Sequence, residues 1–268
     1  MALMLYDHPL SPYGQKVKIA LLEKKVPFEA PLPQNIGSGE RSGEFAKASP
    51  RGEVPALIDG ELGVFDSTII LEYIEDKWPN PPLLPKAPTD RARVRMIEDA
   101  MDTHYEAINW GLGELTFFGR GAGTVADSIR TKAAAQIASW HKWLERQLGD
   151  REWFNGVAFG WGDLSVVPYI NGSRGFGFNP PKGSRLSAWL DRANARPSVV
   201  EVSKAAASMS MQGASAGMQA VRELLEKGLF KREYRDHRLE WMVKSGGMSV
   251  VDDGIKKNNI RFIDPFAS

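Results

Sequence analysis

Two short segments place a hydroxyl side chain where a helix is expected to begin. Ser11 stands directly before Pro12, and serine is a favoured N-cap while proline is a favoured first helical residue. Asp66 and Ser67 stand directly before apolar residues with helical spacing. Because the N–H groups at a helix N-terminus attract anions, each segment can be a plain helix cap, an anion-binding site, or both.

The residue types that are missing narrow the chemistry. The chain has 268 residues and no cysteine, which excludes disulfides, thiolate metal ligands and a protein thiol as nucleophile. Its four histidines, His8, His104, His141 and His237, form no zinc-binding pattern, so no metal is expected. A formal net charge of +1 gives no reason to expect nucleic acid or an anionic membrane as a partner.

The apolar stretches are too short for a membrane anchor. None reaches the roughly 18 residues that a transmembrane helix needs. The apolar residues 2–6 have no basic residues before them, so a buried first strand explains them better than a signal peptide. We therefore predict a cytoplasmic protein.

The first 80 or so residues have the pattern of a small α/β unit. A helix is expected to open at Ser11-Pro12 and another over 67–77. Asp59-Gly60 is a hairpin signal. Strands are predicted at 2–6, 28–30, 56–58 and 63–65. The order predicts a mixed four-stranded sheet with helices on its faces.

A proline-rich stretch separates this unit from the rest. Four of residues 79–85 are proline, which cannot continue a helix, so we place a boundary near residue 84. The predicted domains are 1–84, an all-helical 85–228 and a C-terminal extension 229–268. The aromatic residues of the extension favour a segment that wraps the body over a disordered tail. Helices are predicted at 90–115 and 124–148, and shorter ones at 162–170, 185–195, 198–208 and 218–226.

Four motifs in this order resemble the glutathione transferase superfamily over at least residues 3–205. They are Ser11-Pro12-Tyr13-Gly14-Gln15-Lys16-Val17, the run from Ser49 to Leu57, Phe65-Asp66-Ser67-Thr68-Ile69-Ile70, and Trp189-Leu190-Asp191-Arg192 followed by Ala195-Arg196-Pro197. The resemblance implies an α/β thioredoxin-like N-terminal domain plus an all-α helical C-terminal domain, usually paired as a homodimer. One departure is Gly160, where the family often has Ser or Thr opening a buried helix.

The resemblance also implies how a bound glutathione would be activated. Ser11 is the expected catalytic residue, because a hydroxyl that donates a hydrogen bond to sulfur favours the thiolate. Tyr13 and Tyr6 are rivals for this role, and Tyr13 is also a candidate contact of either substrate.

The same resemblance implies which residues contact the other parts of bound glutathione. The Val54-Pro55 bond is expected to be cis, with the Val54 backbone pairing with the cysteinyl part of glutathione. Asp66 and Ser67 are expected to hold the γ-glutamyl end. Candidates near the glycyl carboxylate are Arg41, with Arg51, Lys47 and Gln34 as alternatives, and Glu53, whose own carboxylate would repel that end unless it is paired.

The second substrate is expected between the domains. Aromatic residues on the first long helix are the candidates for this pocket, and core packing is the alternative explanation for them: Tyr105, Trp110 and Phe117.

The function implied is a glutathione transferase that joins the glutathione thiolate to a hydrophobic electrophile, with glutathione as co-substrate and no metal. A glutathione-dependent lyase that cleaves ethers, a peroxidase, a dehalogenase and a non-catalytic binding or regulatory protein remain as alternatives. Because cysteine is missing, relatives that reduce mixed disulfides through a cysteine at position 11 are excluded.

Overall fold

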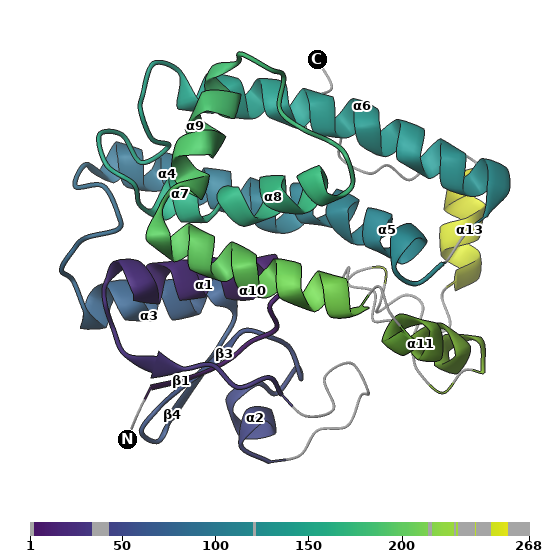
Figure 1. Ribbon diagram of the computed structural model, residues 1–268, viewed down its shortest axis with the longest axis horizontal. Helices are drawn as coiled ribbons and strands as arrows, with labels where there is room; N and C mark the ends of the chain where they lie inside the picture. The colour runs from purple at the N-terminus through teal and green to yellow at the C-terminus, as the bar shows by residue number, and fades with distance from the viewer. Residues whose placement is uncertain are drawn as a thin grey trace.

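A four-stranded mixed sheet lies below α1 and α3 in Figure 1. The computed structural model describes residues 3–33, 43–119, 122–213, 216–227, 229, 239 and 248–256. The strands are β1 (Leu3–Tyr6), β2 (Phe28–Glu29), β3 (Ala56–Asp59) and β4 (Leu62–Phe65), in the order β2-β1-β3-β4. β1 is parallel to β2 and antiparallel to β3, which is antiparallel to β4, so the predicted mixed sheet is confirmed.

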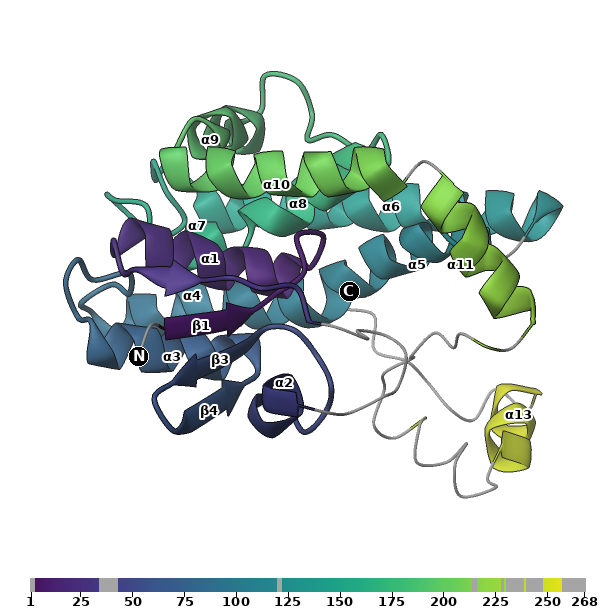
Figure 2. The ribbon, with the colours of Figure 1, turned by 60° about the horizontal axis from the view of Figure 1, so that its bottom comes forward.

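Three helices accompany the sheet: α1 (Pro12–Glu23), α2 (Gly43–Ala48) and α3 (Ser67–Lys77). In Figure 2, α1 lies between the sheet and the helices of the C-terminal region. Val17 and Ile70 on α1 and α3 are fully buried, as is Leu5 of β1. Since α1 is covered on both sides, polar groups on it must find partners within the protein.

The proline-rich stretch after α3 is held by a buried ion pair. Lys24 Nζ lies 2.7 Å from Glu75 Oε2, and it also donates to the carbonyls of Trp78 and Pro81. Glu75 in turn accepts the N–H groups of Leu83 and Leu84. Residues 78–85 are therefore fixed to α1 and α3.

The remaining described elements are helical. They are α4 (Pro88–Ala100), the π-helical turn η1 (Met101–Tyr105), α5 (Glu106–Thr116), α6 (Gly123–Leu148), α7 (Trp161–Leu164), α8 (Val167–Gly175), α9 (Arg185–Asn194), α10 (Pro197–Gly213), α11 (Ala216–Glu226) and α13 (Met248–Lys256).

Two of the predicted helices differ from the structure. The helix predicted over 90–115 is interrupted by the π turn at Met101–Tyr105. The one predicted over 162–170 is divided into α7 and α8, because Pro168 lacks the N–H needed to continue the hydrogen bonding of α7.

Gly160, the departure noted at the start of α7, has a steric reason. A Cβ built there would lie 2.3 Å from the Leu83 carbonyl oxygen and 2.3 Å from Asn155 Nδ2. Asp163 Oδ2 accepts the Gly160 N–H at 3.1 Å and so caps the start of α7 from within the helix. Glycine is therefore the residue that fits this close approach.

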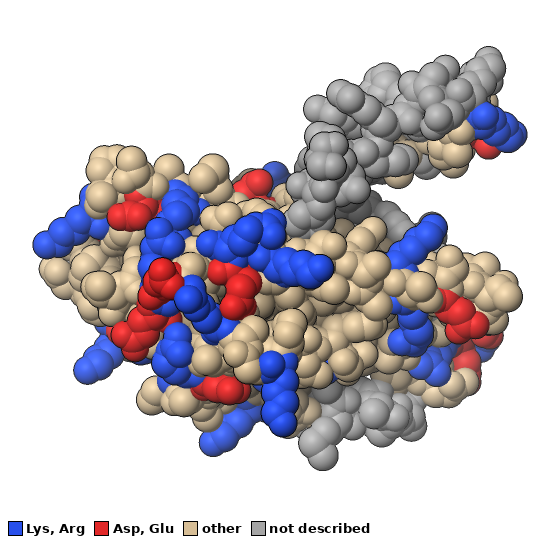
Figure 3. All heavy atoms as spheres, turned by 90° about the horizontal axis from the view of Figure 1, so that it is seen from above, with Lys and Arg blue, Asp and Glu red and all other residues tan. Residues whose placement is uncertain are grey.

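The predicted domain boundary and the predicted C-terminal extension stay predictions. One hydrophobic core includes both Leu3 of the sheet region and Val202 of the helical region, so it does not mark a boundary at residue 84. The extension 229–268 is described only at 229, 239 and α13, so its wrapping also stays a prediction. No helix among the described residues is long and apolar enough to cross a membrane. Acidic and basic side chains are interspersed on the face seen in Figure 3.

Candidate functional site

The sheet register brings the three candidate segments to the same end of the strands. Tyr6 pairs with Ala56, and Ala56 pairs with Phe65, so these residues form one row across β1, β3 and β4. The loop to Ser11 leaves from one end of this row, the Val54-Pro55 segment enters at its centre and Asp66-Ser67 follows its other end. Segments far apart in the sequence therefore meet at the same side of the sheet.

Ser11 is the N-cap of α1, as predicted. Its Oγ accepts the Gly14 N–H at 3.2 Å, and its backbone N–H bonds to the His8 carbonyl. Because the cap uses a lone pair of the oxygen, the hydroxyl proton is available to a ligand at the positive end of α1. The side chain is half-buried, which allows such contact.

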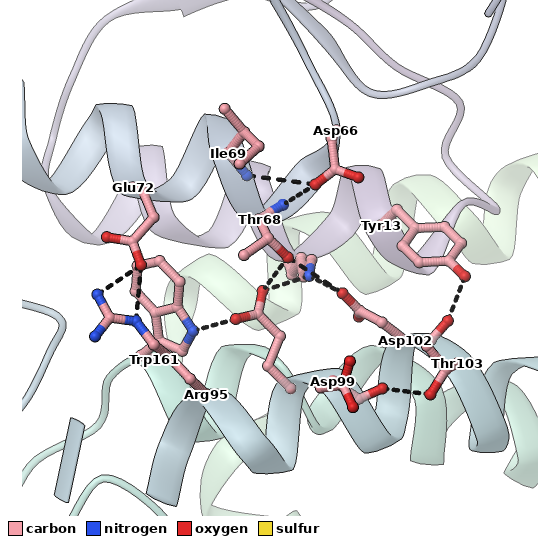
Figure 4. A network of polar contacts seen from close by, with 12 residues as sticks. Tyr13, Asp66, Thr68, Ile69, Glu72, Arg95, Asp99, Asp102, Thr103 and Trp161 are labelled. Carbon is pink, nitrogen blue, oxygen red and sulfur yellow. Dashed lines mark hydrogen bonds and ion pairs between the residues drawn. The ribbon is translucent and has the colours of Figure 1, made fainter. Parts of the chain in front are cut away.

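Tyr13 has its phenolic proton engaged within the protein. Its hydroxyl donates to the main-chain carbonyl of Asp102 at 2.6 Å (Figure 4). That carbonyl is available because of the π turn: the Glu106 N–H, which would bond to Asp102 in an α-helix, bonds to the Met101 carbonyl. Tyr6, the other rival, packs its ring on Phe45 with centroids 5.3 Å apart.

Asp66, and not Ser67, provides the cap of α3. Asp66 Oδ1 accepts the N–H groups of Thr68 at 3.0 Å and Ile69 at 3.4 Å. The backbone of Asp66 has a φ of 74°, a conformation in which residues other than glycine are uncommon. Ser67 is the first residue of the helix and nearly fully buried, and its contact with the γ-glutamyl end of glutathione stays a prediction.

The Val54-Pro55 bond is cis, as the resemblance implies. The loop before it is braced by buried Ser49, whose hydroxyl accepts the Glu53 N–H and donates to the Glu53 carbonyl, both at 2.9 Å. Val54 is half-buried and Pro55 buried.

The candidates for the glycyl carboxylate have mixed outcomes. Arg41 and Gln34 lie outside the described residues. Lys47 forms an exposed ion pair with Glu44 at 2.5 Å, and the Arg51 guanidinium lies over the Phe65 ring at 5.1 Å. The roles of Arg41 and Glu53 stay predictions.

A buried charged cluster, which sequence reasoning missed, joins the two helix N-termini to the helical region (Figure 4). Lys16 on α1 has no exposed surface, and its Nζ lies 2.6 Å from Glu98 Oε1 and 2.5 Å from Asp102 Oδ2. Thr68 Oγ1 donates to the same Glu98 oxygen at 3.0 Å. The cluster is completed by Trp161, which donates to Glu98, and Tyr169, which donates to Asp102.

The charges of the cluster depend on one another. Burial by itself would lower the pKa of Lys16, but the carboxylates of Asp102 and Glu98 outweigh it and raise that pKa. Burial raises the pKa of Asp102 despite the opposing effect of Lys16. The sequence around Ser11 does not indicate that Lys16 is buried in an ion pair, because its partners Glu98 and Asp102 are more than 80 residues away.

Glu106 is a second residue that sequence reasoning missed. Its carboxyl group is hydrogen-bonded to Tyr13, and burial together with the Asp102 carboxylate raises its pKa to about 7. Trp110 follows it by one turn of α5, and Phe117 is the C-cap residue directly after that helix. Trp110 is half-buried and Phe117 is 36% exposed, and the placement of both in a second-substrate pocket stays a prediction.

Tyr105 differs from these two residues. Its ring is fully buried, and its hydroxyl lies 3.1 Å from His141 Nε2 and 2.8 Å from Ser173 Oγ. The prediction that Tyr105 lines the second-substrate pocket is therefore wrong, because the π turn directs it into the helical core. No group of acidic residues and histidines that could hold a metal ion occurs within the described part of the chain.

Comparison with known proteins agrees with this geometry. Residues 5–82 match the family model described as glutathione S-transferase, N-terminal domain. Glutathione S-transferase U28 of Arabidopsis thaliana is 30% identical over 170 residues, which cover 63% of this chain and 71% of that protein. The chain belongs to the glutathione transferase superfamily.

The chain is also similar to a solved structure and to a relative with a different name. The crystal structure of rice glutathione transferase GST1 in complex with glutathione is 28% identical, with a TM-score of 0.63, and the match covers 80% of this chain and 99% of that one. A stringent starvation protein A homologue of Coxiella burnetii is 36% identical over 93 residues, which is 35% of this chain. This match spans only 43% of that relative's length.

Membership in the glutathione transferase superfamily supports glutathione as a ligand. It also agrees with a thioredoxin-like sheet domain followed by a mostly helical region.

Proposed function

We propose that this protein is a glutathione transferase that joins the glutathione thiolate to a hydrophobic electrophile. The observation that carries the proposal is the placement of Ser11 at the N-terminus of α1, with its hydroxyl proton not needed for the cap. A free thiol titrates near ~8.5, so it is mostly protonated at neutral pH. A donated hydrogen bond and the positive end of α1 both favour the thiolate.

Glutathione would be held along the end of the sheet where Ser11, Val54-Pro55 and Asp66-Ser67 meet. The Val54 backbone would pair with its cysteinyl part. Its γ-glutamyl carboxylate would meet the N-terminus of α3 at Ser67, and its ammonium would meet Asp66. The electrophile would lie against Trp110 of α5 and Phe117 at the C-cap of that helix, and Tyr13 would lie between the two substrates.

The open end of this pocket would be closed by α11. Arg222 on α11 donates to the carbonyls of Phe117 at 2.8 Å and Thr116 at 3.1 Å. These carbonyls end α5 and have no partner within the helix, so a cation there is favourable. The contact fixes the chain beside Phe117.

A homodimer is part of the proposal. Exposed apolar side chains lie on β4, α3 and α4, namely Leu62 at 46%, Ile69 at 56% and Met96 at 63%. Arg95 and Glu72, beside Met96 and one turn after Ile69, form an ion pair at 2.6 Å that joins α3 to α4. Light scattering would give the mass in solution, and Ile69→Glu should reduce it to that of the monomer.

The substitution Ser11→Ala tests the activation of the thiol. We expect kcat with 1-chloro-2,4-dinitrobenzene to fall by roughly 10²-fold or more, as for loss of one donor to a developing anion. Glutathione affinity, measured by calorimetry, should change much less, because the backbone and α3 contacts remain. Ser139→Ala, on the exposed face of α6, is the matched control.

Two outcomes would contradict the proposal. Full activity in Ser11→Ala would show that another group activates the thiol. If the wild-type protein binds glutathione but turns over no electrophile, the non-catalytic alternative would be favoured. The similarity to the stringent starvation protein A homologue is the observation that supports this alternative, because that relative is not named for transfer activity.

A further inference from the structure

The strand β2 forms one edge of the sheet. In the order β2-β1-β3-β4 its neighbour among the described strands is β1. Directly after β1, the Asp7 N–H donates to the Pro31 carbonyl at 3.4 Å. Main-chain groups turn alternately to the two sides of a strand, so those of Glu29, two residues before Pro31, also face β1. Those of Phe28 and Ala30 therefore face outward, away from the sheet.

The prolines of this segment leave the outward-facing groups intact. Pro27 and Pro31 have no N–H, but both lie in the register that faces β1. Phe28 and Ala30 keep their N–H groups, and no described strand pairs with this outer side. Main-chain groups at such an edge can pair with an extended peptide. Because the two prolines bracket the edge, it fits a short segment.

A groove lies between this edge and α10. Its volume is about 420 Å³, in the lower part of the roughly 300–1,000 Å³ range of ligand pockets. Its walls come from α1, from the chain that enters and leaves β2, and from α10, which runs beside α1 in Figure 2. An apolar side chain of a peptide paired with β2 can enter this groove, because the lining includes Leu22, Val26, Phe28, Ala30, Val202 and Ala205.

Two charged residues complete the lining, Lys18 and Glu201. Lys18 Nζ lies 2.7 Å from Oδ2 of the buried Asp7, so its charge is balanced within the protein. Glu201 is exposed, and its carboxylate forms no ion pair with any other described residue. It lies one turn before Ala205 on the same face of α10. The groove therefore offers one carboxylate to a cation of its ligand.

We propose that this groove binds an extended segment of a partner protein, which adds a strand to the outer edge of β2. Side chains two residues apart in a strand lie on the same face. When an apolar side chain of the segment enters the groove, the side chain two positions away is therefore on the side of Glu201. The segment is expected to carry an apolar residue and a lysine or arginine, separated by one residue.

The groove is separate from the proposed glutathione site. It shares no residue with Ser11, Val54-Pro55 or Asp66-Ser67. Lys18, its first lining residue on α1, lies about two turns after Ser11. The inference therefore does not depend on transferase activity, and glutathione should not compete with the peptide.

A synthetic peptide with this pattern tests the proposal: fluorescein-Thr-Thr-Leu-Thr-Lys-Thr-amide, with its binding to the full chain followed by fluorescence polarisation. We expect saturable binding, and Ala205→Trp should raise the Kd by roughly tenfold or more, because the indole fills the groove. Ala207→Trp is the matched control, since this exposed position lies on the opposite side of α10. Thermal melts of both variants show that they are folded.

Two further changes distinguish strand addition from other modes of binding. Methylation of successive main-chain nitrogens of the peptide should weaken binding at alternate residues only, because every second N–H points toward β2. Glu201→Lys should raise the Kd by about threefold to fivefold, the range for an exposed ion pair. A peptide with glutamate in place of lysine should then bind this variant better than the wild-type protein.

The remaining outcomes decide against the inference. It is overturned if no saturable binding occurs, if Ala205→Trp and Ala207→Trp act equally, or if the methylation effects do not alternate. Displacement of the peptide by glutathione would place it at the proposed transferase site and would also overturn the inference. If Ala205→Trp lowers the mass measured by light scattering, the groove is an interface between copies of this chain and not a site for a partner. None of these outcomes affects the proposed transferase function.

Discussion

Tyr13 on α1 donates its phenolic proton to the main-chain carbonyl of Asp102, 2.6 Å away on the π-helical turn. Together with the ion pairs of Lys16, this bond links α1, whose N-terminus carries Ser11, to the helical region. It also removes Tyr13 from the donors that could reach a glutathione sulfur without breaking an internal hydrogen bond. The bond thereby favours Ser11 over Tyr13 as the activator of the thiol.

Tyr13→Phe should consequently leave the ionisation of bound glutathione unchanged. The pKa of the bound thiol can be followed by the ultraviolet absorption of the thiolate as the pH is varied. Ser11→Ala, measured in the same way, should raise that pKa toward the free value of ~8.5. If Tyr13→Phe raises it as much as Ser11→Ala does, the assignment of roles is reversed.

Lys16→Met should destabilise the protein strongly. Lys16 is fully buried between Glu98 and Asp102, so its removal leaves two buried carboxyl groups without their cation. Breaking a buried pair in this way costs about 3–5 kcal/mol of unfolding free energy, measurable by urea denaturation. Adding Asp102→Asn should recover part of that loss.

Lys47→Met is the matched control for this change. Lys47 forms an ion pair with Glu44 on the surface of α2, where solvent screens the interaction, so little change is expected. Equal effects of the two lysine substitutions would argue against a structural role for the cluster.

Two helical glycines should respond in opposite ways to alanine. A Cβ at Gly14 would lie 1.6 Å from Asp7 Oδ1, and Asp7 is buried and paired with Lys18 at 2.7 Å. Gly14→Ala should therefore destabilise by about 1–3 kcal/mol. At Gly111 on α5 a Cβ meets nothing within 4 Å, so Gly111→Ala should stabilise by about 0.5–1 kcal/mol. Thermal melts that shift in the same direction would contradict this reasoning.

His141 should make the protein sensitive to acid. Burial lowers its pKa from 6.5 to about 4, and it is 3% exposed beside Tyr105. Below pH 6.5 the unfolded chain binds a proton that the folded chain does not, so this stabilising contribution is complete above pH 6.5. It is lost as the pH falls toward 4, by up to about 3 kcal/mol.

The measurement compares urea unfolding of the wild-type protein and His141→Gln across this range. The wild-type free energy of unfolding should decrease more steeply with falling pH than that of the variant. Parallel curves would show that His141 is not the group responsible.

The order of the elements and the starts of the helices were predictable because they depend on neighbouring residues. Ser11-Pro12 determines the start of α1 through side-chain capping and the fixed φ of proline. The short apolar runs 56–58 and 63–65, with the Asp59-Gly60 turn signal between them, determine the β3–β4 hairpin. The missing cysteine likewise excludes a protein thiol whatever the fold.

Other properties required the tertiary structure, because they depend on groups distant along the chain. Lys16 looked like a surface lysine until its partners, 82 and 86 residues away, were placed beside it. Tyr105 looked like a pocket residue until the π turn directed it into the core. The hydroxyl at Ser11 could be predicted as a helix cap from the sequence alone. That its rival Tyr13 is committed to the Asp102 carbonyl followed only from the contact between α1 and η1.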